Sequence, residues 1–220
     1  MVRFLYNILI PLLIPGALIR LWFRGRAEPA YRHHLAERFG HLPSNLGAGA
    51  DIWLHAVSAG ESIAAAPLIE ALLARGHTLV LSTTTPTGRA QLMRQFSGRA
   101  VICYGPFDVP RCVKRFLNQV RPKLALMIET EIWPNWMTLC ASRAIPVALI
   151  NARLSERSFR GYQKLGSMMG ATLRQFSWIA VQSAAHANRF AALGATANQL
   201  SVTGSIKADQ VLPEDFIEQV

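Results

Sequence analysis

From residue 51 onwards, short apolar runs alternate with longer segments in which apolar residues recur at helical spacing. The runs are almost continuously apolar, which is typical of strands buried on both faces of a parallel sheet. Between the first two runs, segment 61–76 repeats apolar residues every three or four positions and ends at Gly76, so it predicts a helix. Strands are predicted at 52–57, 78–82, 100–104, 124–128, 146–151, 178–182 and 200–204.

This alternation of strand and helix predicts the fold class, a doubly wound, Rossmann-like α/β fold with a parallel sheet covered by crossover helices. In such sheets ligands bind outside the carboxyl ends of the strands. We therefore expect the functional site among the segments that follow the strands, although ordinary turn and capping chemistry is the alternative for each segment alone. These segments are SAGE, STTTPTG, GPFD, ETEIWPN, NARLS, QS and TGSIKAD.

The first residues of the chain carry a different pattern. Residues 4–19 contain no charge and lie between Arg3 and Arg20. As a helix they would cover about 24 Å, less than a hydrocarbon core of about 30 Å, and Pro11 and Pro15 would kink it. A tilted membrane span, a helix lying in the membrane interface and a buried amphipathic helix all remain open.

The residues after this run favour a membrane interface. Trp22 and Phe23 lie among Arg20, Arg24 and Arg26, and no small-residue cleavage site follows the run. Aromatic and basic side chains are typical of the head-group level, and the excess of positive charge after the run favours the cytoplasmic side. We expect a membrane-anchor helix with a basic segment over residues 1–41, a linker at 42–50 and an α/β domain over 51–220.

Composition and charge exclude only a few classes of protein and of binding partner. With 51% hydrophobic and 16% charged residues the chain is too apolar to be disordered. The net charge of +10 attracts anions of any kind, including anionic lipids and phosphorylated substrates. No helix-turn-helix, RNA-recognition or zinc-finger signature is present, which disfavours a nucleic-acid partner.

The thiol and imidazole side chains predict neither disulfides nor a metal site. The three cysteines form no CxxC pair, so we expect reduced thiols. The six histidines have no spacing that is typical of metal ligands. No cofactor is predicted either, because no G-x-G-x-x-G sequence follows the first strand and no Walker A sequence occurs.

Segment 55–61, His-Ala-Val-Ser-Ala-Gly-Glu, joins the first strand to its helix. Gly60 would allow a tight turn, and the helix dipole would favour an ionised Glu61 in the first helical turn. Such a carboxylate at the mouth of a crevice can act as a general base on a substrate hydroxyl. Complementation of the helix dipole is an equally good interpretation of the same residue.

Segment 82–88, Ser-Thr-Thr-Thr-Pro-Thr-Gly, brings five hydroxyls to the start of the next helix. Hydroxyls at a helix N-terminus can bind a phosphate or a sugar, although a Thr-rich cap is also common structure. This segment, the SAGE segment and the start of the following helix, which carries Arg89, supply the predicted substrate-binding residues. They are Ser58, Gly60, Thr84, Thr85, Thr87 and Arg89.

Segment 129–135 and the residue after it place Glu129 and Glu131 with Trp133 and Trp136 at a strand end. Carboxylates with aromatic rings recur at carbohydrate sites, so function is favoured here. If the strand continued, the two carboxylates would point opposite ways, and one of them would be structural.

Two further groups of residues are interpreted as structural. The basic helical face of Arg111, Lys114 and Arg115 indicates a solvated surface more than a phosphate-binding patch. Tyr162, Met168 and Met169 indicate helix packing.

Taken together, these segments resemble the 3-deoxy-D-manno-octulosonic acid (Kdo) transferases of Gram-negative lipopolysaccharide synthesis. The resemblance covers essentially the whole chain, and its motifs are WLHAVSAGE at 53–61, STTTPTG at 82–88, ETEIWPN at 129–135, NARLSERSFRGY at 151–162 and AVQSAAHANRFAALGA at 180–195. It implies the N-terminal half of a metal-independent, two-domain GT-B glycosyltransferase on the cytoplasmic face of the inner membrane. That enzyme would transfer Kdo from CMP-Kdo to the lipid A precursor lipid IVA, without a cofactor, beside anionic inner-membrane lipids.

The resemblance also implies catalytic roles. Glu61 matches the general base, while Glu131 and Lys207 match positions that stabilise the transition state. Lys207 lies in Ser205-Ile-Lys-Ala-Asp209, where the family often has Asn-Leu-Lys-Phe-Asp. A lysine there would oppose the negative charge that develops on the departing CMP.

Family members are roughly twice as long, and their second domain holds the CMP-Kdo site. We therefore expect residues 1–220 to form the acceptor-binding half and to have negligible transferase activity alone, because GT-B catalysis occurs between two domains. The alternative is a non-enzymatic, membrane-docked lipid-binding module. Glu61→Gln distinguishes the two, since only a transferase would lose an activity.

Overall fold

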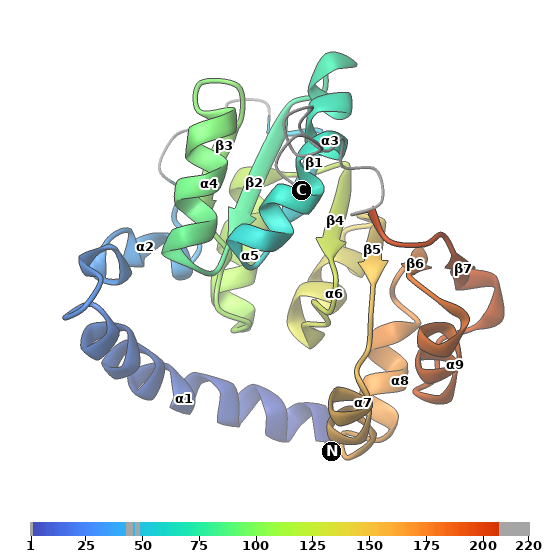
Figure 1. The fold of residues 1–220 in the computed structure, drawn as a ribbon. Coiled ribbons are helices and arrows are strands. Elements are labelled where there is room, and N and C mark those ends of the chain that lie inside the picture. The colour runs from blue at the N-terminus through green and yellow to red at the C-terminus, as the bar shows by residue number, and fades with distance from the viewer. Residues whose placement is uncertain (1, 43–45, 47–48, 207–220) are drawn as a thin grey trace, which may run out of the picture.

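The computed structural model describes residues 2–42, 46 and 49–206. Its centre is a parallel sheet in the order β3-β2-β1-β4-β5-β6-β7 (Figure 1). This confirms the predicted doubly wound α/β fold and every predicted strand. The strands are β1 (Ile52–His55), β2 (Leu79–Thr83), β3 (Val101–Tyr104), β4 (Leu124–Ile128), β5 (Val147–Ala152), β6 (Trp178–Val181) and β7 (Leu200–Val202).

Helices cover the sheet because each crossover between parallel strands carries at least one. The helix predicted at 61–76 is α3, and Gly76 follows its end with a φ of 82°. The helical elements are α1 (Val2–Arg24), η1 (Pro29–Arg32), α2 (Leu35–Arg38), α3 (Ala59–Ala74), α4 (Pro86–Phe96), α5 (Pro110–Val120), α6 (Pro134–Ala141), α7 (Glu156–Gln163), α8 (Ser167–Leu173), α9 (Ala184–Ala192) and η2 (Ala197–Gln199).

Successive strand residues point to opposite faces and enter two separate cores. On one face Leu54 and Leu81 pack with Ile69 of α3 and Phe96 of α4. On the other face Trp53, together with the buried residues of α5, α6, α8 and α9, forms the larger core. Cys103, Cys112 and Cys140 are free and buried, and burial raises the pKa of each thiol. Met168 and Met169 are buried as expected.

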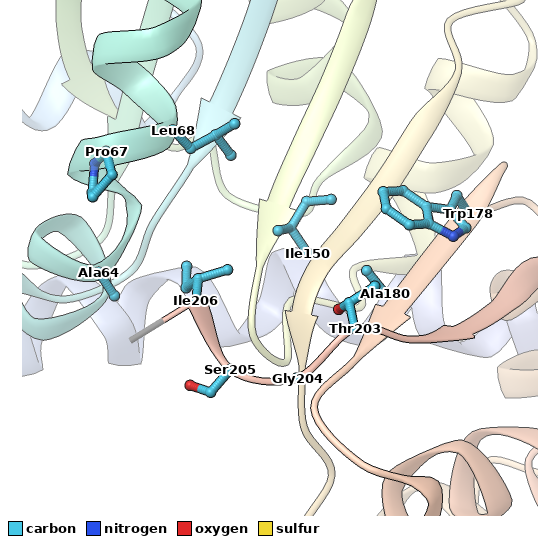
Figure 2. Close-up of a pocket in the computed structure, with 10 residues that line it drawn as sticks. All are labelled: Ala64, Pro67, Leu68, Ile150, Trp178, Ala180, Thr203, Gly204, Ser205 and Ile206. Carbon is cyan, nitrogen blue, oxygen red and sulfur yellow. The ribbon is translucent and has the colours of Figure 1, made fainter. Parts of the chain in front are cut away.

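On the α3 face an apolar groove of about 560 Å³ remains between α3 and strands β5 and β6 (Figure 2). Ala64 and Leu68 of α3 form one wall, while Ile150 and Trp178 lie on the sheet. The segment Thr203–Ile206 closes one end. The sheet is therefore covered less completely on this face.

Helix α1 runs past the carboxyl side of the sheet (Figure 1). It is one continuous helix through Pro11 and Pro15, and the arginine-containing segment after the apolar run extends it to 23 residues, or about 35 Å. By length and composition it can cross a membrane, whereas the sixteen-residue run alone is shorter than the hydrocarbon core. None of its residues is buried, so the structure does not support a buried amphipathic helix.

The segment after α1 packs back onto the α/β domain. Glu37 and Arg38 of α2 are buried, and Arg38 donates to the carbonyl oxygen of Thr84 at 2.8 Å. The backbone NH of Phe107 in turn donates to the carbonyl oxygen of Arg38 at 2.7 Å. The predicted linker 42–50 lies partly outside the described residues, and the division at residue 41 stays a prediction.

Candidate functional site

The loop between β1 and α3 holds Glu61 in a capping arrangement. Ser58 is the N-cap of α3, and its hydroxyl accepts from the backbone NH of Glu61 at 3.3 Å. The same hydroxyl donates to Glu61 Oε1 at 3.0 Å, and the backbone NH of Val57 donates to Glu61 Oε2 at 2.8 Å. These bonds fix the carboxylate at the helix N-terminus, where the dipole favours negative charge.

The surroundings of Glu61 nevertheless raise its pKa above the ordinary value. Burial is the largest cause, and the nearby carboxylates Glu129 and Glu131 add like charge. The bonds from Val57 and Ser58 oppose the rise only in part. A carboxylate with a raised pKa is a stronger base than an exposed one, so the site permits proton abstraction as well as capping.

Glu131 follows β4 and faces β1. Its Oε2 accepts from Trp133 Nε1 and lies 3.6 Å from His55 Nε2. Of the two tryptophans expected at a carbohydrate site, Trp133 is exposed and beside this carboxylate. Trp136 is instead buried against Trp53, with ring centroids 4.8 Å apart, so its expected place at a sugar surface is wrong.

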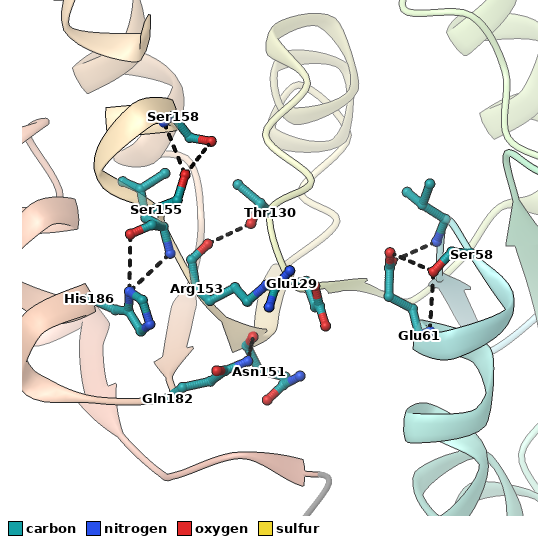
Figure 3. Close-up of polar contacts among 12 residues, drawn as sticks. Ser58, Glu61, Glu129, Thr130, Asn151, Arg153, Ser155, Ser158, Gln182 and His186 are labelled. Carbon is teal, nitrogen blue, oxygen red and sulfur yellow. Dashed lines mark hydrogen bonds and ion pairs between the residues drawn. The ribbon is translucent and has the colours of Figure 1, made fainter. Parts of the chain in front are cut away.

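Glu129 occupies the strained end of β4. Its φ is 65°, and Asn151 at the end of neighbouring β5 has a φ of 56°. A left-handed backbone at a non-glycine residue is sparsely populated and clusters at functional sites. Glu129 Oε2 pairs with Arg153 Nε at 3.0 Å, at the same carboxyl edge as Glu61 (Figure 3). Because the strand stops at Ile128, the alternation expected for a continued strand does not apply; Glu129 pairs with the loop after β5, whereas Glu131 lies beside His55 and Trp133.

The Thr-rich loop combines a capping hydroxyl with exposed ones, of which Thr87 Oγ1 donates to Thr85 Oγ1 at 3.3 Å. Thr85 is the N-cap of α4, where it accepts from the backbone NH of Gly88 at 3.1 Å and donates to the carbonyl oxygen of Val57 at 3.1 Å. The side chains of Thr84 and Thr87 are exposed. A Cβ on Gly88 would lie 2.3 Å from Thr83 Oγ1 and 3.2 Å from the backbone carbonyl carbon of Ser58, so glycine allows this loop to approach the loop after β1. The loop therefore caps α4 and also exposes two threonine side chains to solvent.

Two predicted substrate-binding residues have a different local setting from the one expected. Arg89 pairs with the buried carboxylate of Glu37 at 2.5 Å and lies over the ring of Tyr104, so it has a structural partner already. Gly60 lies within α3 and makes no left-handed turn, so the tight turn expected there is wrong. Its surroundings are open, since an added Cβ would meet only Ser58 Oγ at 4.0 Å.

Lys207 lies outside the described residues. The last described residue, Ile206, donates its backbone NH to Asn151 Oδ1 at 3.2 Å. Asn151 is fully buried, and its carbonyl oxygen accepts from Gln182 Nε2 at 3.1 Å (Figure 3). The chain that leads to Lys207 is thus attached to the carboxyl end of β5.

His55 and Asn151 are the site residues that sequence reasoning missed. The spacing of the histidines indicates no metal site, but it does not show that Ser82 is the register neighbour of His55 on β2. The register of the two predicted strands was the signal that could have found this pair. Within the described ranges, no group of three or more His, Cys, Asp or Glu side chains is arranged to hold a metal ion.

The chain is similar in sequence to known proteins over most of its length. The profile of the family described as 3-deoxy-D-manno-octulosonic-acid transferase (kdotransferase) matches residues 33–210. The 3-deoxy-D-manno-octulosonic acid transferase of Haemophilus influenzae is 35% identical over 99% of this chain and 52% of its own length. The protein of the same name from Bordetella pertussis is 37% identical over 90% of this chain and 48% of its own length. The chain thus spans about half the length of these curated relatives.

Among solved structures, a putative UDP-N-acetylglucosamine 2-epimerase from Listeria monocytogenes superimposes with a TM-score of 0.53. It is 14% identical and matches 71% of this chain and 45% of its own. At this identity the likeness shows the fold alone, which is the GT-B-like Rossmann half that the sequence predicted.

Proposed function

The chain belongs to the Kdo transferase family, and from this premise we propose that it is the acceptor-binding half of an enzyme that transfers Kdo from CMP-Kdo to lipid IVA. The observation that carries the proposal is Glu61, which is held at the start of α3 with a raised pKa beside two further carboxylates. Such a group suits the deprotonation of an acceptor hydroxyl.

In the proposed reaction Glu61 accepts the proton of the acceptor hydroxyl as its oxygen attacks the anomeric carbon of Kdo. The bond from that carbon to the CMP phosphate oxygen breaks, and CMP leaves with the bonding electron pair. Glu131 would stabilise positive charge on the sugar ring in the transition state. Lys207 would neutralise the phosphate of the departing CMP, a role that rests on the family resemblance alone.

The surface around Glu61 suits a lipid-linked sugar phosphate. The hydroxyls of Thr84 and Thr87 and the open space at Gly60 adjoin the start of α3 and α4. Ser58 donates to Glu61, Thr85 accepts from Gly88, and Arg89 pairs with Glu37. These three residues would therefore contribute to acceptor binding by holding the loops in place. The CMP-Kdo donor would be held mainly by a second domain.

We further propose that α1 attaches the chain to the cytoplasmic face of the inner membrane. Leu5, Leu9, Leu12 and Leu13 recur along one side of the helix and are exposed, while the other side faces the α/β domain. Arginines at both ends would contact anionic lipid head groups. This arrangement brings the membrane, from which lipid IVA is taken, to the carboxyl side of the sheet.

The alternative, a non-enzymatic lipid-binding module, shares these features and differs only in catalysis. The test joins residues 1–220 to the C-terminal half of the Haemophilus influenzae relative and measures Kdo transfer to lipid IVA. We expect transfer by the joined protein, none by residues 1–220 alone, and lipid IVA binding by both.

Glu61→Gln should abolish transfer by the joined protein and leave lipid IVA binding intact. Glu70→Gln on the exposed part of the same helix is the matched control and should leave both unchanged. Transfer that survives Glu61→Gln would reject the proposed base, and Kdo transfer by residues 1–220 alone would reject the assignment of this chain as an incomplete half.

A further inference from the structure

The parallel pairing of β1 and β2 brings an imidazole and a hydroxyl together at the carboxyl edge of the sheet. His55 is the register partner of Ser82, and His55 Nδ1 lies 2.8 Å from Ser82 Oγ. Trp53, two residues before His55 on the same face of β1, donates from Nε1 to Ser82 Oγ at 2.7 Å. All three side chains are fully buried.

These contacts favour one of the two neutral tautomers of the imidazole. An indole Nε1 is a donor only, so Ser82 Oγ must accept from Trp53. The one hydroxyl proton of Ser82 is then directed to His55 Nδ1, because its other acceptor, the carbonyl oxygen of Leu54, lies 3.5 Å away. In the neutral ring this geometry favours Nδ1 as the acceptor and the hydrogen on Nε2.

The protonated nitrogen points at the proposed catalytic carboxylate. Among the described residues, His55 Nε2 is buried without a hydrogen-bond partner, and Glu131 Oε2 is 3.6 Å away. An unpaired buried N–H is costly, whereas a shift of well under 1 Å in Glu131 would complete the bond. The ring itself has little freedom, because Trp136 packs edge-on against it at 4.8 Å and Gly105 adjoins its Cε1–Nδ1 side.

We propose that His55 is a positioning residue for Glu131, held as the Nε2–H tautomer by the chain Trp53–Ser82–His55. In this role the Nε2–H of His55, once Glu131 closes the 3.6 Å gap, joins the indole N–H of Trp133 in holding the carboxylate at the carboxyl edge. His55 contacts no substrate and transfers no proton. The catalytic role of Glu131 rests on the proposed function, whereas the tautomer of His55 and its contact with Glu131 do not.

The first experiment therefore needs no transferase activity. Residues 1–220 are labelled with ¹⁵N in detergent micelles, and the imidazole nitrogens of His55 are assigned by their loss in His55→Gln. We expect the spectrum of an Nε2–H tautomer, with an Nε2 resonance that moves in Glu131→Gln and stays in Glu70→Gln. An Nδ1–H tautomer, or an Nε2 resonance that ignores Glu131→Gln, would overturn the proposal.

The second experiment measures Kdo transfer by the joined two-domain protein. His55→Phe should lower kcat about tenfold or more with little change in KM, the size expected for a lost hydrogen bond to a charged group. His55→Gln, which can still present an N–H to Glu131, should recover most of the rate and guards against a folding defect in the Phe variant.

In a Glu131→Gln background, His55→Phe should add little further loss, because the two residues act as one unit. Equal losses in both backgrounds would contradict the proposal. If the unmodified joined protein transfers no Kdo, the proposed function fails, and the tautomer spectrum still decides whether His55 positions Glu131.

Discussion

The hydroxyl of Tyr6 donates a 2.7 Å hydrogen bond to Asp108 Oδ2 and so joins the N-terminal helix to the loop after β3. Asp108 also accepts from the backbone NH groups of Asn135 and Trp136, at 3.1 and 2.9 Å, in the first turn of α6. A single buried carboxylate therefore connects α1 with the helix that follows the Glu131 loop.

Asp108 should make stability depend on pH. Burial is the main cause that raises the pKa of Asp108 to about 6, above its unfolded value of 3.8. A carboxyl whose pKa is raised by folding contributes stability below the unfolded pKa, and this contribution is lost as pH rises through the folded pKa. We expect the unfolding free energy of the unmodified protein, relative to Asp108→Asn, to fall between about pH 4 and pH 6. Urea unfolding across this range measures the difference.

Tyr6→Phe supplies the matched control for Asp108. The Tyr6 hydroxyl stabilises the ionised carboxylate and lowers its pKa, so its removal should move this pH dependence to higher pH. A difference between Asp108→Asn and the unmodified protein that does not vary with pH would show that Asp108 stays ionised in the folded state.

The exposed side of α1 should determine membrane binding. Leu12 is 68% exposed in the middle of the apolar stripe, so Leu12→Glu should weaken partition into vesicles of anionic lipid on the order of tenfold. Ile63→Glu, on the exposed side of α3, places the same charge away from the stripe and should have little effect. Vesicle co-sedimentation measures both, and equal weakening by both variants would indicate a general charge effect instead of a helix-specific one.

Features encoded by local pattern could be predicted from the sequence, whereas contacts between distant segments could not. The apolar runs predicted the strands, and the sequence around Glu61 predicted its place in the first turn of a helix. The pairing of Arg89 with Glu37 depends on how α2 folds back over 52 positions of chain, which no local pattern reports. The proposed role of His55 was missed for the same reason, because it depends on strand register. The burial of Trp136 was missed because a tryptophan in a polar motif can still point into the core.

Gly105 should be needed for the position of the His55 ring. A Cβ there would lie 2.9 Å from His55 Cε1 and 3.0 Å from Trp136 Cη2, so one ring must move. We expect Gly105→Ala to lower the unfolding free energy by about 1–3 kcal/mol, as overpacking does, and to change the His55 imidazole resonances. Gly161→Ala on exposed α7 meets nothing within 4 Å and should instead stabilise the protein by about 0.5–1 kcal/mol. Unfolding curves that rank these variants in the opposite order would contradict the packing described at Gly105.

The pKa of Glu61 should respond in opposite directions to its two kinds of neighbour. Glu131 adds like charge, so Glu131→Gln should lower the pKa of Glu61 towards its ordinary value. The Ser58 hydroxyl donates to the ionised carboxylate, so Ser58→Ala should raise that pKa further. Titration of the ¹³C carboxyl resonance of Glu61 in residues 1–220 measures both shifts without any transferase assay. In the joined protein the acidic limb of the rate against pH should move with them, because only the ionised carboxylate can accept the acceptor's proton. A limb that stays in place while the Glu61 resonance shifts would assign the base to another residue.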